Sequence, residues 1–392
     1  MKYSKDQDYF IKKALEGGNI FLSGKAGTGK SFIVKELISK LQNKGKNVIC
    51  VAPTGIAAIN IGGQTIHSLF SIPVDGTITF EVCRFLKPAK RAVMQNCDVI
   101  IIDEISMLRA DVLDGIDLTL KKNRLGGLKN KQIIFVGDLK QLPVVVNKNI
   151  EAILFSEGYD DFSFLGAKIY NSLNVECIEL QEILRQTDKE FIENLNIIRE
   201  GGKSSYFKKF VNKEAKGVIL APYNASVQEY NRKGIESYTG QKYEFKATYT
   251  GLVKESDFPF ENTITVRNGC PIMYLVNDNS GTSLRNGTIG KFYMIDNTPT
   301  IEVDGIKYIL QKETITKKEY VYDQIEDKLV LKEMGSCVQY PIKLAFVLSI
   351  HKSQGLTFKE VTVDLTRPCF IKGQMYVALS RVTSPKGLRL LI

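Results

Sequence analysis

Residues 24–31 read GKAGTGKS, a full match to the phosphate-binding loop pattern, the P-loop. The short apolar run at 20–22 precedes it, and between 33 and 41 apolar residues recur on one helical face. The loop is therefore expected to join a buried strand to an amphipathic helix, the context that this pattern needs.

The residue types of the loop suit a nucleotide. Its glycines let backbone N–H groups turn toward phosphate oxygens, and the helix N-terminus adds the positive end of its dipole. Lys30 is placed to reach the β- and γ-phosphates, and the Ser31 hydroxyl to bind Mg²⁺. We expect ATP and Mg²⁺ as cofactors, with nucleotide contacts from Gly24, Ala26, Gly27, Thr28, Gly29, Lys30 and Ser31. The alternative is a glycine-rich turn with a lysine beside it by chance.

Composition sets outer bounds on the function. The chain has 392 residues, 44% of them hydrophobic and 24% charged, which is enough for two or three globular domains. The net charge of +10 favours a polyanionic partner without identifying one, since a modest basic excess also serves solubility.

The cysteines point to a reducing compartment. No CxxC pair occurs, and several cysteines lie in apolar runs, so we expect reduced core residues instead of a disulfide or zinc framework. The seven are Cys50, Cys83, Cys97, Cys177, Cys270, Cys337 and Cys369. With a polar N-terminus and no apolar stretch near the roughly 20 residues of a membrane span, we expect a cytosolic protein, nucleoid-associated if bacterial.

The order of apolar runs predicts an α/β fold in two units. Strand-like runs at 20–22, 48–52, 99–102 and 133–136 alternate with helical patterns, which predicts a parallel sheet with its ligand loops at the carboxyl ends of the strands. A small insertion at about 70–96 interrupts this first unit, which we place at 1–175. A second alternation covers 176–240 and 340–392. Between them, short β-branched and aromatic runs at 241–339 predict an inserted β-barrel.

Two acids follow the apolar run at 99–102. We assign Asp103 to the metal and Glu104 to positioning or deprotonating the attacking water, as in a Walker B site. Gln141, in GDLKQLP at 137–143, follows the next run and is assigned to sensing the γ-phosphate. The alternatives are a surface loop for the paired acids, and turn-forming roles for Asp138 and Gln141 near Pro143.

Two arginines occur in the second α/β unit. If the two units face one another across the nucleotide, Arg185 and Arg381 reach the γ-phosphate as arginine fingers. Loss of that phosphate would then open the cleft in each cycle. The alternative for each arginine is a surface salt bridge.

The chain has only two histidines, and their surroundings favour nucleic acid over metal. No Cys/His/Asp spacing supports a metal site. We expect phosphate contacts from the strand end Pro53-Thr54 and from Lys352 and Ser353, and flat faces for base stacking from His67 and Phe70. His351 is included as a nucleic-acid contact.

Together these segments resemble the superfamily-one DNA helicases of the Pif/RecD-like branch over essentially the whole chain. The resemblance rests on KDQ at 5–7, GKAGTGKS, APTGIAAINIGGQTIHSLF, IIDEISML, GDLKQLP, LRQ at 184–186, SIHKSQGLTF and YVALSRV. It departs from the Pif pattern at 125–131 and at Val144, which stands where a second proline is usual.

The resemblance implies a helicase core. It has two RecA-like motor domains, a small wedge insertion in the first, an SH3-like barrel in the second, and 5′-to-3′ movement on single-stranded DNA. It further implies that Gln7 recognises adenine, and that Gln354 and Gly355 belong to the motif that couples both ligands. The expected partners are single-stranded DNA and single/double-strand junctions, bound by a monomer, and the family's settings are DNA repair, recombination and telomere maintenance.

Several points stay open at this stage. Phe80 or Phe85 is a candidate for the wedge aromatic, although either could instead be core. The chain could also be a translocase that strips proteins from single-stranded DNA, an RNA-directed motor, or a nucleotide-gated binding scaffold. The presence of both Glu104 and Arg381 argues against an ATPase that has lost its activity.

Overall fold

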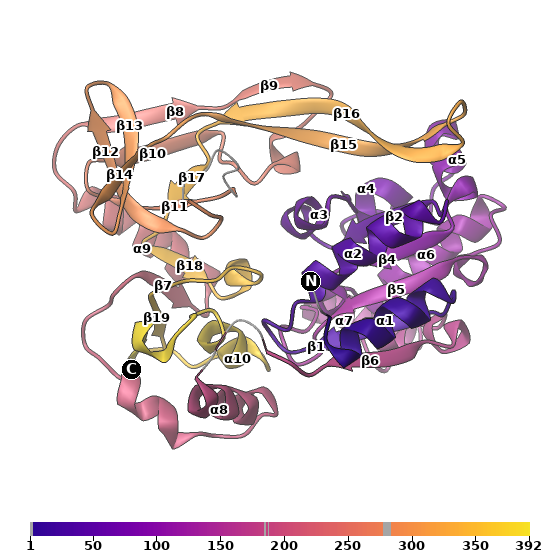
Figure 1. The fold of residues 1–392 in the computed structure, drawn as a ribbon, viewed down its shortest axis with the longest axis horizontal. Helices are drawn as coiled ribbons and strands as arrows, with labels where there is room; N and C mark the ends of the chain where they lie inside the picture. Colours follow the sequence, from indigo (N-terminus) through magenta and orange to yellow (C-terminus); the bar gives the residue numbers. More distant parts are fainter. Residues whose placement is uncertain (1–2, 184–185, 187, 277–283) are drawn as a thin grey trace. The chain divides into compact units, whose positions relative to one another are not determined.

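The computed structural model describes residues 3–183, 186, 188–276 and 284–392. The chain divides into two compact units, each built around a parallel sheet (Figure 1). The first comprises Met1–Arg185 with Lys318–Glu333, and the second comprises Gln186–Lys317 with Met334–Ile392. The parallel α/β architecture expected from the sequence is present in both.

The first unit is a six-stranded sheet with helices on both faces. Its strands are β1 (Ile20–Gly24), β2 (Val48–Ala52), β3 (Gln64–Thr65), β4 (Val99–Ile102), β5 (Gln132–Gly137) and β6 (Glu176–Leu180). Its helices are α1 (Lys5–Leu15), α2 (Lys30–Asn43), α3 (Gly55–Ile61), α4 (Ile66–Phe70), α5 (Pro88–Asn96), α6 (Ala110–Lys122) and α7 (Lys148–Ser156), with short 3₁₀ turns at Ile105–Met107, Leu128–Asn130, Phe164–Gly166 and Tyr170–Leu173.

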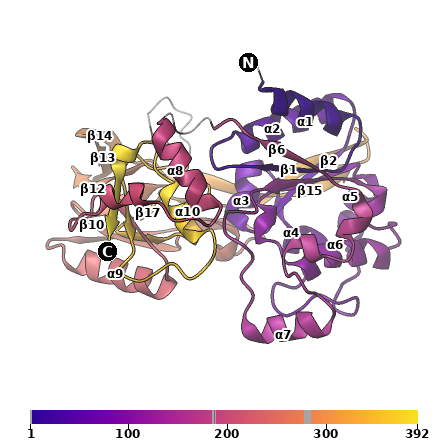
Figure 2. The ribbon, with the colours of Figure 1, turned by 90° about the horizontal axis from the view of Figure 1, so that it is seen from below.

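The strand order is β3-β2-β4-β5-β1-β6, and every pair in it is parallel. In β1, β2, β4 and β5, successive residues enter opposite cores: Ile20 and Leu22 pack with α1 and α2, whereas Phe21 packs with the cluster on the other face. Figure 2 shows α1 and α2 on one side of the sheet and α4 and α6 on the other. Burial on both faces explains why these strands are continuous apolar runs in the sequence.

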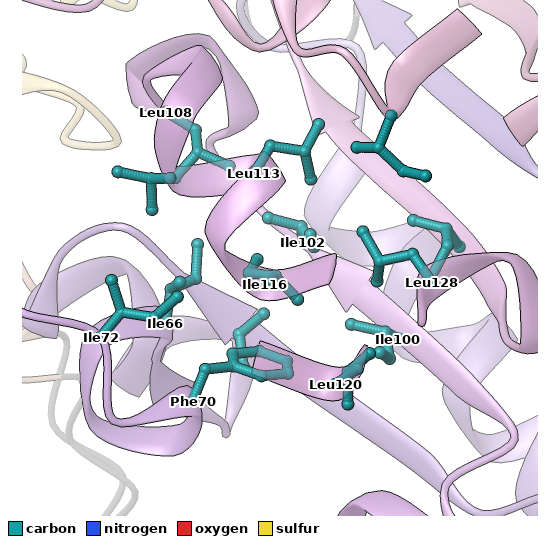
Figure 3. Close-up of a cluster of buried hydrophobic side chains, with 14 of the residues drawn as sticks. Ile66, Phe70, Ile72, Ile100, Ile102, Leu108, Leu113, Ile116, Leu120 and Leu128 are labelled. Carbon is teal, nitrogen blue, oxygen red and sulfur yellow. The ribbon is translucent and has the colours of Figure 1, made fainter. Parts of the chain in front are cut away.

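The predicted insertion at 70–96 is anchored in this core. Ile72, Ile78 and Leu86 belong to the same buried cluster as Leu113 and Ile116 of α6, part of which is drawn in Figure 3. Asn123 at the end of α6 accepts a hydrogen bond from the backbone N–H of Leu86 at 2.9 Å. Buried apolar contacts and this hydrogen bond therefore attach the segment to the first unit.

The boundary expected at 175/176 is wrong. β6 pairs in parallel with β1 along its whole length, and its Ile178 and Leu180 complete the core beneath α1 and α2. The first unit therefore continues to 185. An apolar run in the sequence indicates a strand but does not say which sheet it joins.

The second unit contains a four-stranded parallel sheet of order β18-β7-β19-β20. Its strands are β7 (Val218–Ala221), β18 (Val347–Ser349), β19 (Val361–Asp364) and β20 (Leu388–Leu391), and its helices are α8 (Lys189–Arg199), α9 (Asn224–Glu236) and α10 (Gln374–Leu379). 3₁₀ turns lie at Ser205–Phe210, Glu255–Asp257, His351–Ser353 and Pro385–Gly387.

An antiparallel β-region is inserted between α9 and β18, as the sequence indicated. It contains β8 (Lys242–Lys246), β9 (Thr248–Gly251), β10 (Thr263–Arg267), β11 (Pro271–Tyr274), β12 (Ile289–Ile295), β13 (Thr298–Val303), β14 (Ile306–Ile309), β15 (Glu313–Asp323), β16 (Lys328–Gln339) and β17 (Ile342–Leu344). A core of its own, with Phe292 and Ile301 fully buried, holds it together. An SH3-like topology for it stays an expectation.

The hairpin of β15 and β16 was not predicted, and its tip, residues 318–333, belongs to the first unit instead of the barrel. The Tyr320 hydroxyl accepts a hydrogen bond from the backbone N–H of Cys50 in β2 at 2.9 Å, and the Tyr320 N–H donates to Gln64 Oε1 at 3.1 Å. Most residues of the two strands are half-buried or exposed, and polar residues interrupt the apolar ones, so the sequence shows no long apolar run there.

The cysteines are free, and Cys50, Cys83, Cys97, Cys270 and Cys337 are buried as expected. Cys177, in the edge strand β6, is exposed, which contradicts the prediction of a core position. Among the described residues, no helix has the length and apolar character needed to cross a membrane.

Candidate functional site

The carboxyl ends of four adjacent strands in the first unit bring the sequence motifs together. β2, β4, β5 and β1 are neighbours in that order, and all run in parallel. Pro53-Thr54 follows β2, Asp103-Glu104 follows β4, the segment 138–141 follows β5, and the P-loop begins at the end of β1. This edge is where ligands bind in open α/β sheets.

The P-loop has the backbone that its glycines allow. Gly27 and Gly29 adopt left-handed φ values of 84° and 81°, which only glycine adopts without strain. Gly24 has no room for a side chain, because a Cβ there would lie 2.8 Å from Thr28 Oγ1. The Thr28 hydroxyl donates to the Lys25 carbonyl at 3.0 Å and braces the turn.

Lys30 directs its ammonium group back over the loop. Its Nζ donates to the carbonyls of Gly24 at 2.6 Å and Lys25 at 3.1 Å. The charge is therefore held at the start of α2, where the loop N–H groups and the helix N-terminus favour an anion. Buried Ala26 and exposed Ser31 complete the loop.

Asp103 and Glu104 form a strained acidic pair. Burial first, and then the charge of Glu104, raise the pKa of Asp103 to about 7, while Lys30 opposes that shift. The backbone N–H of Glu104 donates to Asp103 Oδ1 at 2.9 Å. Glu104 itself has φ 49° and ψ 43°, a left-handed conformation that costs a non-glycine residue of order 1–3 kcal/mol.

These residues fit ATP and Mg²⁺. A carboxylate and a hydroxyl, from Asp103 and Ser31, are the hard oxygen donors that Mg²⁺ takes alongside phosphate oxygens and water. A cation at Asp103 would relieve the electrostatic cost that raises its pKa. The lysine, the turned glycines and this carboxylate are all set at one sheet edge.

Gln141 is buried against Asp138. Its Nε2 donates to Asp138 Oδ2 at 3.3 Å, and the backbone N–H of Lys140 donates to Asp138 Oδ1 at 3.0 Å. Asp138 therefore stabilises the turn after β5, which is the turn-forming role named above as the alternative. It also orients the Gln141 amide. The sensor assignment of Gln141 stays a prediction.

Gln7 takes part in a capping box at the start of α1. The Ser4 hydroxyl accepts from the Gln7 N–H, and Gln7 Oε1 accepts from the Ser4 N–H at 3.1 Å. Its side chain is buried. A structural role is therefore visible, and recognition of adenine by Gln7 stays a prediction.

The predicted nucleic-acid contacts of the first unit differ in exposure. Pro53 and Thr54 are half-buried, and the Thr54 hydroxyl caps α3 by accepting from the Ala57 N–H at 3.3 Å. His67 is half-buried, with Nδ1 3.3 Å from the Ile72 carbonyl. Phe70 is wrong as a stacking residue: it is fully buried in the core shown in Figure 3.

In the second unit the segment 351–355 follows β18. Lys352 is exposed, and Gly355 has a left-handed φ of 80°. Half-buried His351 has its pKa lowered by burial, so its imidazole is neutral near pH 7. Ser353 is wrong as a phosphate contact, because it is fully buried and its hydroxyl donates to the Ile350 carbonyl at 2.7 Å. Gln354 is half-buried.

Arg381 is almost completely buried within the second unit, with 2% of its surface exposed. Its guanidinium donates to the carbonyls of Val377 at 2.9 Å, Leu356 at 3.3 Å and Ser353 at 3.5 Å. It therefore ties the end of α10 to segment 351–356, a structural role that the sequence did not predict. The other predicted finger, Arg185, lies outside the described residues.

Two buried glutamines were missed by the sequence reasoning. Gln186 Nε2 donates to the carbonyls of Ser380 and Val382, each at 3.1 Å, which joins LRQ to the ALSR segment. Gln374 Nε2 donates to the Pro222 carbonyl at 3.0 Å, and its Oε1 accepts from the Phe370 N–H at 3.1 Å. A polar residue opening the apolar helix QMYVAL was the available signal for Gln374.

Comparison with known proteins agrees with this geometry. The family profile of the PIF1-like helicases matches residues 3–220. The ATP-dependent DNA helicase Pif1 of Campylobacter jejuni is 30% identical, over 97% of this chain and 90% of its own length.

Solved structures of Pif1 from Bacteroides sp. are also similar. The complex with ADP-AlF4 is 33% identical, with a TM-score of 0.87, over 100% of this chain and 92% of that one. The complex with single-stranded DNA is 34% identical, with a TM-score of 0.69 and the same coverage. From the motifs, their arrangement at one sheet edge and these similarities together, the chain belongs to the PIF1-like helicase family.

Proposed function

We propose that this protein is an ATP-dependent DNA helicase that moves 5′-to-3′ along single-stranded DNA and separates the duplex ahead of it. The observation that carries the proposal is the meeting of the P-loop, Asp103-Glu104, Gln141 and Thr54 on four neighbouring strand ends. Relatives named as ATP-dependent DNA helicases, and a similar structure holding single-stranded DNA, support DNA as the partner.

The chemistry of the first step follows from the side chains at this edge. Lys30 and the loop N–H groups bind the phosphates, and Ser31 and Asp103 would hold Mg²⁺. Bound there, Mg²⁺ supplies neutralisation of the charge that develops on the phosphate oxygens. Glu104 orients the attacking water and accepts its proton. Glu104 directly follows the proposed metal ligand Asp103, and its left-handed backbone conformation sets the direction of its carboxylate.

Nucleotide chemistry and strand contact lie on neighbouring strands of one sheet. The backbone N–H of Asp103 donates to the Val51 carbonyl of β2 at 2.9 Å, and β2 leads within two residues of its end to Thr54. A displacement at Asp103 is therefore passed to the β2 loop through a short, rigid path. This is the link by which ATP turnover would change the grip of Thr54 on a phosphate.

The second unit offers a matching link. Lys352 is exposed for phosphate contact, and the carbonyls of Ser353 and Leu356, in the same loop, are bound by Arg381. If Arg381 responds to the γ-phosphate as a finger, its movement releases these carbonyls and with them the Lys352 loop. We propose this exchange as the way in which hydrolysis across the two motor units drives a step.

Strand separation is assigned to the insertion at 70–96. Phe85 is 73% and Phe80 48% exposed, and Lys122 Nζ lies 4.8 Å from the Phe80 ring centre and 5.8 Å from that of Phe85. Stacking a base on an aromatic ring returns about 1–3 kcal/mol, comparable with the roughly 1.4 kcal/mol of a base-pair step. Exposed aromatic rings favour an unwinding enzyme over a translocase that only displaces proteins.

The test is ATP-dependent unwinding of matched duplexes that carry the same single-stranded tail on either the 5′ or the 3′ side. We expect unwinding of the 5′-tailed duplex only. Displacement of streptavidin from a biotinylated single strand without unwinding of either duplex would favour the stripping activity instead. Greater ATPase stimulation by an RNA strand of the same sequence would favour an RNA motor.

A further inference from the structure

A cavity of about 650 Å³ opens beside α6 in the first unit. Its walls come from residues 78–80 of the insertion, from α6, from Lys129, and from the segment 157–172 that follows α7. The volume lies within the roughly 300–1,000 Å³ usual for ligand sites. Of the described residues assigned above to the nucleotide or to DNA, only Phe80 lines it, so the proposed function does not account for the cavity.

The cavity extends toward the amino edge of the first sheet, which is the edge opposite the P-loop. α6 connects the parallel strands β4 and β5, so it runs back across the sheet and ends near the amino end of β5. Lys121 in its last turn lines the cavity, and so does Lys129 in the 3₁₀ turn just before β5. A ligand in the cavity would therefore not occupy the nucleotide site.

Buried aspartates of α6 hold the walls of the cavity in place. Asp114 accepts a hydrogen bond from the Tyr159 hydroxyl at 2.7 Å. It also accepts from the backbone N–H groups of Lys168 at 3.0 Å and Ile169 at 2.9 Å. Asp117 accepts from the backbone N–H of Leu128 at 2.8 Å, next to Lys129. Segments distant in sequence are thus fixed around the cavity without a ligand, which lowers the entropic cost of binding one.

The charges of the cavity are divided between its interior and its rim. Asp114 and Asp117 are only 6% and 4% exposed, and both already have hydrogen-bond partners. The three lysines of the lining, Lys121, Lys129 and Lys168, are exposed. Lys121 is paired with Asp117 at 2.7 Å. The charge that an approaching ligand meets is therefore chiefly the positive charge of Lys129 and Lys168.

The ammonium group of Lys168 is oriented by its neighbours. Its Nζ donates to the Glu157 carbonyl at 2.9 Å and lies 4.6 Å from the centre of the Tyr159 ring. Glu157 is half-buried and is the one further acid among the described residues of the lining. An anionic ligand would therefore have to place its charges at the lysines and away from Glu157.

Apolar surface lines the cavity and continues next to it. The insertion, α6 and the segment after α7 all contribute apolar or aromatic side chains to the lining, namely Ile78, Phe80, Leu118, Tyr159 and Ile169. α7 ends directly before Glu157, and within this helix only Leu154 is buried, whereas Ile153 is 43% and Phe155 68% exposed. Figure 2 shows α6 and α7 on the same side of the sheet. A protein segment could cover both the cavity and this helix, which an enclosed small molecule could not.

We propose that the cavity binds a segment of a partner protein in which apolar side chains are flanked by acidic residues. The apolar side chains would fill the cavity, and the acidic residues would pair with Lys129 and Lys168. A nucleic-acid strand fits less well, because it carries a phosphate at every step and cannot avoid Glu157. Since residues 78–80 form one wall, the partner would contact the insertion to which strand separation is assigned.

The test measures binding of the full chain to labelled peptides by fluorescence anisotropy at low salt. The probe carries a Leu-Phe pair flanked by aspartates, and two companion peptides carry serines or lysines in place of the aspartates. We expect the acidic probe to bind roughly 3- to 30-fold more tightly than the serine peptide, from two exposed ion pairs, and the lysine peptide to bind most weakly. Equal affinity for all three peptides would overturn the inference.

Charge reversal at the rim locates the site. Lys129→Glu and Lys168→Glu should each weaken binding of the acidic probe by roughly 3- to 10-fold and strengthen binding of the lysine peptide, whereas Lys129→Arg should bind like wild type. The matched control is Lys44→Glu, which changes an exposed lysine at the end of α2, on the other face of the sheet. Thermal unfolding checks that each variant is folded. Folded reversal variants that bind every peptide as wild type does would contradict the proposal.

Amide hydrogen exchange gives an independent location for the bound probe. The acidic peptide should slow exchange in residues 78–80 and 168–172 and leave the P-loop unchanged. Protection confined to other segments would show that the peptide binds elsewhere, and the inference would be wrong. It would also be wrong if the lysine reversals weakened binding of a forked duplex and left the affinity for the acidic peptide unchanged.

Failure of this inference differs from failure of the proposed function. Peptide binding at the cavity requires neither ATP nor DNA, so its absence would leave the helicase proposal intact. If DNA fails to raise ATP turnover while the acidic peptide binds as expected, the helicase proposal is wrong and the peptide site remains.

Discussion

The carboxyl edges of the two parallel sheets differ in how their polar groups are held. At the first edge, a carboxylate with a raised pKa and a glutamate in a left-handed conformation lie beside the P-loop. At the second edge, Arg381 and Gln374 are buried with hydrogen-bond partners, and Phe370, stacked on Tyr223, is exposed. Backbone and electrostatic strain at the first edge is typical of a catalytic site. Buried polar groups with hydrogen-bond partners at the second edge are typical of a rigid support for binding.

The largest expected effect is on ATP turnover, and it should arise at the edge of the first sheet and not at that of the second. Glu104→Gln keeps the size of the side chain but removes the base, so ATP turnover with DNA should fall by about 10²- to 10⁴-fold. Binding of a fluorescent ATP analogue should persist. The control is Glu193→Gln, which changes an exposed glutamate on α8 in the second unit. Turnover within a few-fold of wild type would mean that the strained Glu104 is not catalytic.

At the edge of the second sheet, the main expected effect is on the free energy of unfolding. Arg381→Lys cannot supply the planar set of donors, so carbonyls of Ser353, Leu356 and Val377 lose partners in a buried setting. We expect a loss of about 2–4 kcal/mol in the free energy of unfolding, measured by chemical denaturation. The exposed Arg232→Lys on α9 is the matched control. Unchanged stability with a large loss of turnover would identify Arg381 as a finger without a structural role.

The smallest expected change in stability has the opposite sign to that of Arg381→Lys. Asp103→Asn should abolish turnover yet stabilise the nucleotide-free protein by on the order of 1 kcal/mol at pH 8, because the folded state disfavours the charged carboxylate. The folded pKa of about 7 lies above the usual 3.8. The wild type therefore loses stability as pH rises from about 4 to 7, and the full penalty remains above pH 7.

The measurement is thermal unfolding of both proteins across this pH range. The gap between Asp103→Asn and wild type should open between pH 4 and 7 and then stay constant. A gap independent of pH would show that Asp103 is not under electrostatic stress, and the contrast between the two edges would lose its basis.

Sequence predicted the elements that are buried on both faces. The bounds expected for β2 and β4 match the structure, because a strand covered on both sides must be a continuous apolar run. The β15–β16 hairpin escaped prediction for the converse reason, since its strands are mostly half-buried or exposed and carry no long apolar run. Residues 176–180, which form β6, were assigned to the second unit, because strand order depends on contacts distant in sequence.

For the site, the sequence motifs identified candidate residues but not whether their side chains are buried or exposed. The structure brings Lys30, Asp103 and Glu104 to one sheet edge, as their place after apolar runs indicated, and their catalytic roles stay predictions. Phe70 and Ser353 were assigned to DNA although both are fully buried. The amide of Gln374 could not be placed, since its partners Pro222 and Phe370 lie in two loops that meet only after folding.

The central claim is that the first sheet edge hydrolyses ATP in response to a DNA strand. The most direct test is steady-state ATP turnover of wild type and Lys30→Ala, each with and without single-stranded DNA. We predict that DNA raises wild-type turnover, and that Lys30→Ala lowers the stimulated rate by about 10²- to 10³-fold because the phosphates lose their charged partner. Near-normal stimulated turnover in Lys30→Ala would contradict the claim.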